Sequence, residues 1–230
     1  MANLEILMIT RNRLEYLKKA LPSVLNQTYK DLKLVIWDNG SDEGIVRYLG
    51  TIDDPRVDII INGKNEGLAN VTTKVFLSSR CEFVGKVDSD MIITPDWAER
   101  LIAKHQERHY GFIGGFHFKP EDLINIEPIT ENDVWQKHHI GGNYIIRRDD
   151  FKGYRGEGVH GLSEYQAEMG LINGYLWNPI LWVEHMEDYR SKYYIDTKEY
   201  NQYKLETRGM NLADYRSFTN HKLYLKENTK

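Results

Sequence analysis

Residues 6–44 decide the fold, and they read ILMITRNRLEYLKKALPSVLNQTYKDLKLVIWDNGSDEG. The stretch begins inside a short apolar run, Leu4–Ile9, and contains a second one, Leu32–Trp37; both have the length and composition of buried strands. Between the two runs, apolar residues recur at helical spacing, which predicts a helix over Arg13–Asn26. A strand, a helix and a strand in this order are typical of the βαβ unit from which parallel sheets are built.

The same alternation continues to about residue 110. It predicts the strands Val57–Ile61 and Phe83–Val87 and the helices Glu43–Leu49, Glu66–Ser78 and Pro95–His109. Beyond residue 110 the pattern predicts the strands Phe112–Phe118, Asn143–Ile146 and Tyr175–Glu184, the last interrupted by Pro179, and a helix over Leu162–Ile172. Residues 119–139 are polar, and we expect a loop over a site. The pattern therefore predicts an α/β fold with a mostly parallel central sheet.

The composition is that of a globular chain. The protein has 230 residues with a formal net charge of -4, and 41% of them are hydrophobic. These values predict a large domain with a real core, and the negative total disfavours a protein whose main task is to bind nucleic acid. No window reaches the roughly 18 uninterrupted apolar residues of a membrane span. Since the start MANLEILMIT does not look like a secretion signal and Cys81 is the only cysteine, we expect a cytoplasmic protein without disulfides.

Acidic residues follow two of the predicted strands. Asp38 ends the second strand, and Asp88-Ser89-Asp90 ends the fourth. In an open α/β sheet, ligands bind beyond the carboxyl ends of the strands, where the strand order reverses. Carboxylates there can accept a hydrogen bond from a base or a ribose, and two of them one residue apart can hold a hard divalent cation. The alternative is that Asp38 only forms a turn and that the other two are solvated loop charges.

Two common phosphate-binding motifs are absent. The chain has no G-x-x-x-x-G-K-[ST] loop, and after the first strand it has Thr10-Arg11-Asn12-Arg13 in place of G-x-G-x-x-G. A P-loop NTPase and a Rossmann dehydrogenase are both disfavoured. The charge of a bound diphosphate would then be met by a metal ion at the acidic pair and by basic side chains such as Arg13 or Lys64.

Together these motifs resemble family 2 glycosyltransferases of the GT-A fold. The resemblance begins in residues 6–44, with the T-x-N-R type turn, the S-x-x-x-Q of the helix and the D-N-G-S after the second strand. It continues through Lys64-Asn65-Glu66-Gly67-Leu68-Ala69-Asn70 to the D-x-D at Asp88 to Asp90 and Pro95. It covers about the first 100 residues well and the stretch from Gly141 to His185 more loosely.

The resemblance implies a domain organisation. A GT-A-like three-layer sandwich would span residues 1–190, in which residues 1–110 bind a nucleotide sugar and residues 111–190 bind the acceptor. Residues 191–230 would form a helical, tyrosine-rich tail. This tail has eight Lys and Arg against five Asp and Glu, and six of the fifteen tyrosines.

The resemblance also implies roles for single residues on the donor side. Thr10 and Arg13 would line the nucleotide pocket, Asp38 would bind the base, and Asp88 would contact the ribose or the metal ion. Asp90 would bind Mn²⁺ or Mg²⁺ at the diphosphate of a UDP-sugar or GDP-sugar. His185 stands where some members have a third metal ligand, although a lone histidine is more often structural or exposed.

On the acceptor side, Gly142 and Asn143 belong to a segment that resembles the loop ahead of the acceptor strand. Trp135 lies in the polar stretch and is the aromatic residue that we expect to contact the acceptor. Glu164 is our first choice for the catalytic base, although Ser163-Glu164-Tyr165 replaces the acidic pair of the family. Glu164 is alternatively an acid of the first turn of a helix, and the other candidates for the base are Glu157, Glu168 and Asp188.

We therefore expect a metal-dependent glycosyltransferase that moves a sugar from a nucleotide-diphosphate sugar to an acceptor hydroxyl, with inversion and a carboxylate base. Three other functions remain open. They are a non-catalytic nucleotide-sugar or glycan binding module, a sugar-phosphate nucleotidyltransferase, and a nucleic-acid binder that acts through the basic tail.

Overall fold

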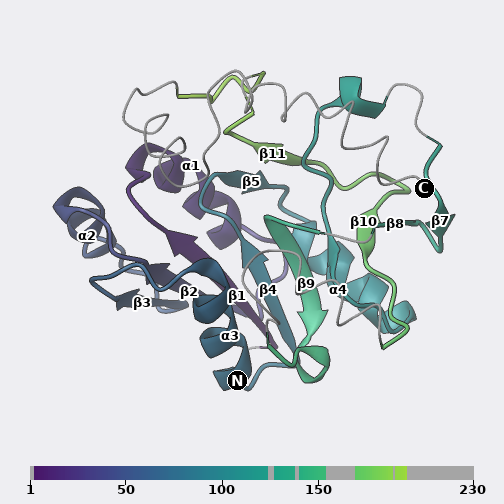
Figure 1. Cartoon of the computed structure of the whole chain (residues 1–230), viewed down its shortest axis with the longest axis horizontal. Coiled ribbons are helices and arrows are strands. Elements are labelled where there is room, and N and C mark those ends of the chain that lie inside the picture. The colour runs from purple at the N-terminus through teal and green to yellow at the C-terminus, as the bar shows by residue number, and fades with distance from the viewer. Residues whose placement is uncertain (1–2, 124–126, 138–139, 154–168, 189, 196–230) are drawn as a thin grey trace.

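Four parallel strands form the first half of the central sheet (Figure 1). In this computed structural model, which describes residues 3–123, 127–137, 140–153, 169–188 and 190–195, they are β1 (Leu4–Thr10), β2 (Leu32–Asp38), β3 (Val57–Ile61) and β4 (Phe83–Val87). β1 is buried along its whole length, with β2 on one side and β4 on the other. Strand order therefore reverses at β1, and the carboxyl ends of three parallel strands meet there. The predicted bounds of the four strands differ from the observed ones by at most one residue.

Five further strands complete the sheet and make it mixed. They are β6 (Ile113–Gly114), β7 (Thr130–Glu131), β8 (Val134–Gln136), β9 (Asn143–Arg147) and β10 (Gly174–Leu176). β9 is antiparallel to both β4 and β6, and β10 is parallel to β6. The order across the sheet is β3-β2-β1-β4-β9-β6-β10-β8-β7. The predicted α/β fold is confirmed, with a parallel core inside a mixed sheet.

Helices cover both faces of the sheet, which gives the three layers that the resemblance implies. α1 (Leu14–Leu25), α2 (Glu43–Leu49) and α4 (Trp97–Glu107) share one hydrophobic cluster with Leu4, Ile6 and Met8 of β1. α3 (Leu68–Ser78) packs on the opposite face, with Leu7 and Ile9. Successive side chains of a strand point to opposite faces, so a strand as apolar as β1 needs a helical layer on each side. None of the helices within the described ranges is long and apolar enough to span a bilayer.

The predicted loop over residues 119–139 is wrong in part. The segment contains a 3₁₀ helix, η1 (Pro120–Leu123), and the antiparallel pair β7–β8. β8 joins the sheet edge because Trp135 pairs with Tyr175 of β10. Strands of two or three residues are too short to show an alternating pattern, so the polar composition concealed them.

The predicted strand Tyr175–Glu184 is two strands in two sheets. β10 belongs to the central sheet, whereas β11 (Val183–His185) pairs antiparallel with β5 (Met91–Ile93) in a two-stranded ribbon. The predicted helix Leu162–Ile172 lies mostly outside the described residues, and its described part, residues 169–172, is not helical.

The S-x-x-x-Q motif, which begins in α1 and ends just after it, has a structural role. Gln27 is fully buried; its amide nitrogen donates to the carbonyl of Thr94 (2.8 Å), and its amide oxygen accepts from the backbone N–H of Ala98 (2.9 Å). The Ser23 hydroxyl accepts from the backbone N–H of Ile93 (3.2 Å). The two side chains thereby fix β5 and the start of α4 against α1, and β5 directly follows the D-x-D.

Candidate active site

A cleft of about 420 Å³ lies at the carboxyl ends of β1 and β4. Of the residues predicted from the sequence, the cleft is lined by Thr10, Arg13, Asp88, Asp90, Gly142 and His185. They come from β1, the start of α1, the turn after β4, the turn before β9, and β11. The structure thus brings together six of the predicted donor, metal and acceptor residues at the point where the strand order reverses.

Asp90, His185 and Glu187 converge in this cleft. Each offers a ligand atom, and the three atoms lie within 4.8 Å of one another. Asp90 and Glu187 are buried, and Asp90 Oδ1 has no hydrogen-bond partner among the described residues. A buried oxygen without a partner costs roughly 1–3 kcal/mol, which a bound cation would offset. Two carboxylates and an imidazole suit Mn²⁺, so this donor set fits the divalent cation expected from the sequence.

The β5–β11 ribbon brings the cluster together. His185 pairs with Met91, the residue after Asp90, and the backbone N–H of Met186 donates to the carbonyl of Asp90 (2.9 Å). His185 Nε2 then lies 3.7 Å from Asp90 Oδ2. β11 ends at His185, and the turn that follows brings Glu187 to the same cleft, so that both side chains line it.

Among the residues that the structure describes, Arg13 is the basic side chain that contacts this cluster. Its guanidinium forms ion pairs with Asp90 Oδ2 (2.5 Å) and with Glu187, and it lies 5.7 Å from the centre of the Tyr16 ring. Burial raises the pKa of Asp90, but the charge of Arg13 and the hydrogen bond with His185 outweigh it and hold this pKa well below its usual range. Asp90 is therefore ionised at neutral pH, the state that a metal ligand needs.

The second acid of the D-x-D has a different environment. Asp88 forms an ion pair with the buried Lys86, and its backbone N–H donates to the carbonyl of Gly142 (2.7 Å). Gly142 has φ +78°, and a Cβ there would collide with the side chain of Met91. Glycine adopts this φ without strain, so the turn before β9 can approach Asp88 closely. Across the cleft, Thr10 Oγ1 is buried without a hydrogen-bond partner in the described part of the chain.

Two residues predicted to bind the donor do not line the cleft. Asp38 is fully buried at the end of β2, and its carboxylate accepts from the backbone N–H of Ser41 (3.3 Å). Lys64 is exposed and pairs with Glu66 (3.4 Å). Their chain neighbours Asn39 and Asn65 line the cleft instead. Asn39 donates to Asn65 Oδ1 (2.7 Å), so the loops after β2 and β3 are joined at its edge.

Two residues predicted on the acceptor side are in the core. Trp135 is 3% exposed and packs edge-on against Trp177, with ring centres 4.7 Å apart. Asn143 is fully buried; its amide accepts from Gly115 N–H (2.7 Å), donates to Gly115 O (3.0 Å) and accepts from Trp97 Nε1 (3.0 Å). The structure therefore corrects the placement of Trp135 in a polar loop and places both side chains away from the cleft.

Glu164, the first choice for the catalytic base, lies outside the described residues, as do Glu157 and Glu168. The fourth candidate, Asp188, is buried. Burial raises the pKa of Asp188, but hydrogen bonds from Arg190 outweigh it and lower this pKa below its usual value. A carboxylate held in the ionised form by its own cation is a poor proton acceptor, so Asp188 is the weakest of the four candidates.

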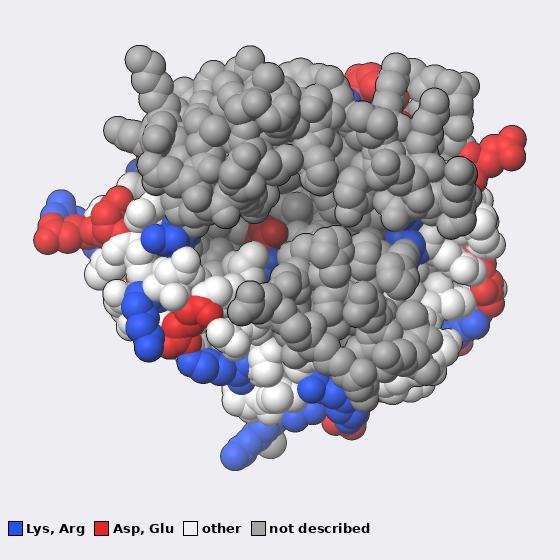
Figure 2. Space-filling model, in the orientation of Figure 1, with Lys and Arg blue, Asp and Glu red and all other residues white. Residues whose placement is uncertain are grey.

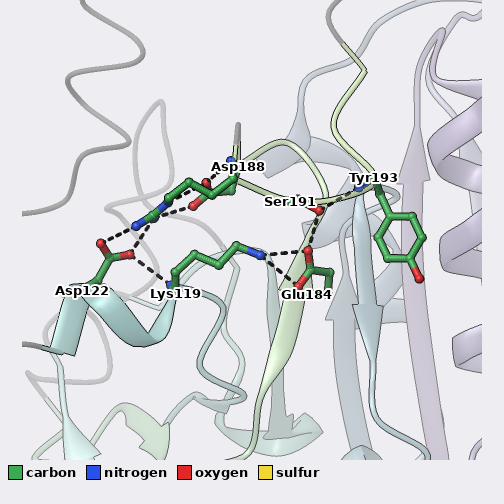
Figure 3. A network of polar contacts seen from close by, with 7 residues as sticks. Lys119, Asp122, Glu184, Asp188, Ser191 and Tyr193 are labelled. Atoms are coloured by element: carbon green, nitrogen blue, oxygen red, sulfur yellow. Dashed lines mark hydrogen bonds and ion pairs between the residues drawn. The ribbon is translucent and has the colours of Figure 1, made fainter.

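Glu187 was not predicted. Its signal in the sequence is the alternation His185-Met186-Glu187 directly after an apolar strand, but the partner strand β5 was also not predicted. Polar contacts hold Glu184 and Asp188, which lie before and after Glu187 in the chain (Figure 3). Lys119 Nζ donates to Glu184 Oε1 (2.8 Å), and Ser191 also bonds to Glu184, while Arg190 joins Asp188 to Asp122. On the described part of the surface in Figure 2, acidic and basic side chains are interspersed.

A mixed central sheet with a parallel core, covered by helices on both faces, is the architecture of the GT-A class of fold. The profile of Glycosyl transferase family 2 matches residues 5–162, and the chain belongs to this family. The resemblance noted in the sequence is thereby confirmed.

Curated relatives are similar over part of their length. The chain is 26% identical over 165 residues to an uncharacterized glycosyltransferase of Haemophilus influenzae. This alignment covers 62% of this chain and 50% of that protein. It is 34% identical over 158 residues to the glucosyl-dolichyl phosphate glucuronosyltransferase of Haloferax volcanii. This alignment covers 60% of this chain and 50% of that protein. The aligned region thus spans about half the length of these two relatives.

Solved structures share the fold. A mannosyltransferase from Pyrobaculum calidifontis, in complex with GDP-Man and Mn²⁺, superposes with a TM-score of 0.69 at 16% identity, over 97% of this chain and 69% of that one. GalNAc-T7 with UDP, GalNAc and Mn²⁺ superposes with a TM-score of 0.60 at 14% identity, over 89% of this chain and 48% of that one. At this level of identity the likeness concerns the fold.

Proposed function

We propose that this chain transfers a sugar from a nucleotide-diphosphate sugar to an acceptor hydroxyl and that it requires a divalent cation held by Asp90, His185 and Glu187. The observation that carries the proposal is the buried Asp90 Oδ1, which has no hydrogen-bond partner in the described residues and belongs to a cluster of three potential ligands in the cleft. Two structural neighbours were solved with Mn²⁺ and a nucleotide or nucleotide sugar, which supports the same ligand class here.

The residues of the cleft provide what a donor needs. Bound Mn²⁺ or Mg²⁺ would neutralise the charge that develops on the departing diphosphate. Arg13 supplies a guanidinium at the cleft, which can form two charge-assisted hydrogen bonds to phosphate oxygens. Gly142 leaves space beside Asp88, and the Thr10 hydroxyl can donate to a bound nucleotide. We propose a UDP-sugar or a GDP-sugar as the donor.

The acceptor must lose a proton as its hydroxyl attacks the sugar. We place this step on Glu164, from the segment that resembles the base segment of the family, and we propose a single displacement that inverts the anomeric centre. The acceptor would bind through residues 111–190, on the side of the cleft that contains Gly142. This arrangement needs no covalent intermediate, because holding donor and acceptor in line supplies much of the rate enhancement.

Thermal unfolding tests the proposed donor and metal. We expect a UDP-sugar or a GDP-sugar to raise the melting temperature with Mn²⁺ present, and the shift to disappear in EDTA, since only the folded protein binds the ligand pair. Asp90→Asn removes one ligand charge from the cluster and should abolish the shift. Asp149→Asn is the matched control, because its side chain is fully exposed and it should keep the shift.

An assay of donor hydrolysis with the same protein distinguishes catalysis from simple binding. We expect slow, Mn²⁺-dependent hydrolysis of the donor in wild type, and its loss in Asp90→Asn. A donor that binds but is never hydrolysed or transferred would identify a binding module instead. Release of pyrophosphate from a nucleoside triphosphate and a sugar phosphate would identify a nucleotidyltransferase. Equal thermal shifts with Mn²⁺ and with EDTA would contradict the metal requirement.

A further inference from the structure

Arg13 bridges the two carboxylates that the cluster offers to a cation. It forms ion pairs with both Asp90 and Glu187, whose side chains are each 7% exposed. Two buried carboxylates this close need a positive charge beside them to offset their burial and their mutual repulsion. In the described structure Arg13 provides that charge.

A divalent cation and Arg13 compete for the same oxygens. A cation bound by Asp90 and Glu187 would satisfy both carboxylates, and it would repel the guanidinium at short range in a site of low dielectric. The pairs made by Arg13 therefore stabilise the cation-free state, and cation binding must first break them. The observed affinity for a cation alone is the intrinsic affinity multiplied by the fraction of molecules in which Arg13 has left the carboxylates. This affinity is low when that fraction is small.

The position of Arg13 decides where the displaced guanidinium goes. Arg13 directly precedes α1 and lines the cleft, so its backbone is fixed while its long side chain can turn. The Tyr16 ring, on the first turn of α1, offers an aromatic face to the guanidinium on the same side. A diphosphate in the cleft is an anion whose geometry suits a guanidinium, with two parallel hydrogen bonds.

We infer that Arg13 and the divalent cation exclude each other at Asp90 and Glu187, and that cation binding transfers the Arg13 guanidinium to the diphosphate of the donor. The inference rests on the proposed function and deepens it, because it makes cation and donor binding cooperative. The cation alone binds weakly, and the donor without the cation finds Arg13 already paired. Such coupling is reciprocal: each ligand raises the affinity for the other by the same factor.

Arg13→Gln tests this exchange, since it removes the charge and keeps a side chain that can hydrogen-bond. Calorimetric titration with Mn²⁺ alone should show binding about tenfold tighter in Arg13→Gln than in wild type, because the internal competitor is gone. Titration with UDP or GDP at saturating Mn²⁺ should show binding about tenfold weaker, because the diphosphate has lost its guanidinium partner. Lys18→Gln is the matched control: it removes one positive charge from an exposed position of α1 and should change neither affinity.

The outcomes separate the exchange from the proposed function. If Mn²⁺ binds in wild type and is lost in Asp90→Asn, but binds Arg13→Gln no more tightly than wild type, the exchange is wrong and the metal site stands. Tighter Mn²⁺ binding with unchanged nucleotide affinity overturns the transfer of Arg13 to the diphosphate. If wild type and Arg13→Gln both fail to bind Mn²⁺ with any nucleoside diphosphate, the proposed metal site itself fails. Thermal unfolding gives a second readout, because Mn²⁺ alone should stabilise Arg13→Gln more than wild type.

Discussion

Arg190 and Asp122 form a double ion pair, with Nη1 2.9 Å from Oδ1 and Nη2 2.8 Å from Oδ2. Arg190 also donates from Nε to Asp188 Oδ1 (2.9 Å), and these hydrogen bonds raise its pKa. The result is a clamp between η1 and the chain that follows β11 (Figure 3). Because Glu187 directly precedes Asp188, the clamp fixes the backbone beside one of the three potential metal ligands.

Asp122→Ala should weaken both stability and cation binding. Its side chain is 6% exposed, so its removal leaves Arg190 with fewer partners, and we expect a loss of about 1–3 kcal/mol in the free energy of unfolding. We also expect weaker Mn²⁺ binding, because the chain beside Glu187 is held less firmly. Urea unfolding and calorimetric titration measure the two effects. Asp149→Ala, at an exposed position, should change neither; unchanged Mn²⁺ affinity in Asp122→Ala would show that the clamp does not position Glu187.

Gly142→Ala should be far more damaging than Gly141→Ala. At residue 142 the backbone has φ +78° and a Cβ would collide with Met91, whereas a Cβ at residue 141 meets no described atom within 4 Å. We expect a loss of about 1–2 kcal/mol for Gly142→Ala, mainly from the backbone conformation because the end of the flexible Met91 side chain can shift, and less than about 0.5 kcal/mol for Gly141→Ala. Urea unfolding of the pair measures this. Equal losses would mean that the turn can shift to accept a side chain.

Asn143→Ala tests the structural role of this residue against its predicted contact with the acceptor. The amide joins β9 to Gly115 and to Trp97 through three hydrogen bonds, so its removal leaves buried groups without partners. We expect a loss of about 2–4 kcal/mol in the free energy of unfolding. Below the unfolding temperature, the KM for the acceptor should stay unchanged. A raised KM with unchanged stability would instead restore the acceptor contact.

His105 should make the protein less stable as the pH falls. Burial lowers its pKa to about 4, while a hydrogen bond from Nε2 to the carbonyl of Ile145 (3.1 Å) favours the protonated form and the nearby Arg147 and His109 disfavour it. The unfolded chain has the ordinary value of 6.5, so between pH 6.5 and 4 it binds a proton that the folded protein does not. Stability is therefore complete above pH 6.5 and is lost as the pH falls, by about 2–3 kcal/mol at pH 4.5.

The measurement for His105 compares two proteins. Urea unfolding at pH 7.5 and at pH 4.5 should show a smaller loss of stability in His105→Gln than in wild type, because glutamine cannot take up the proton. The difference between the two losses isolates His105 from the other groups that titrate in this range. Identical losses would show that His105 is protonated in the folded protein at pH 4.5.

The first half of the fold was predictable because its signals are local. β1 to β4 are runs of five to seven residues with clear ends. The acids at the ends of β2 and β4 therefore lie at the carboxyl ends of the strands, whatever the topology of the rest of the sheet. Asp88 and Asp90 line the cleft there, and so do Thr10 and Arg13, which the resemblance implied for the nucleotide pocket. β1, β2 and β4 are buried on both faces, and parallel strands of this kind leave few alternative arrangements.

The second half depends on pairings between distant segments. Glu187 enters the cleft only because β11 pairs with β5, and each of these strands has three residues. Trp135 is buried only because β8 joins β10, although its neighbours in the chain are polar. No periodic pattern marks such short strands, so their tertiary contacts, and the residues that these contacts bury, cannot be derived from the sequence.

The β5–β11 ribbon determines when the cluster is assembled during synthesis of the chain. During synthesis, Asp90 leaves the ribosome well before His185 and Glu187, so the parallel core can form while the cluster still lacks two of its three members. In that interval Arg13 can pair with Asp90 but not yet with Glu187. The proposed cation site would therefore be completed in a late step, when the ribbon closes.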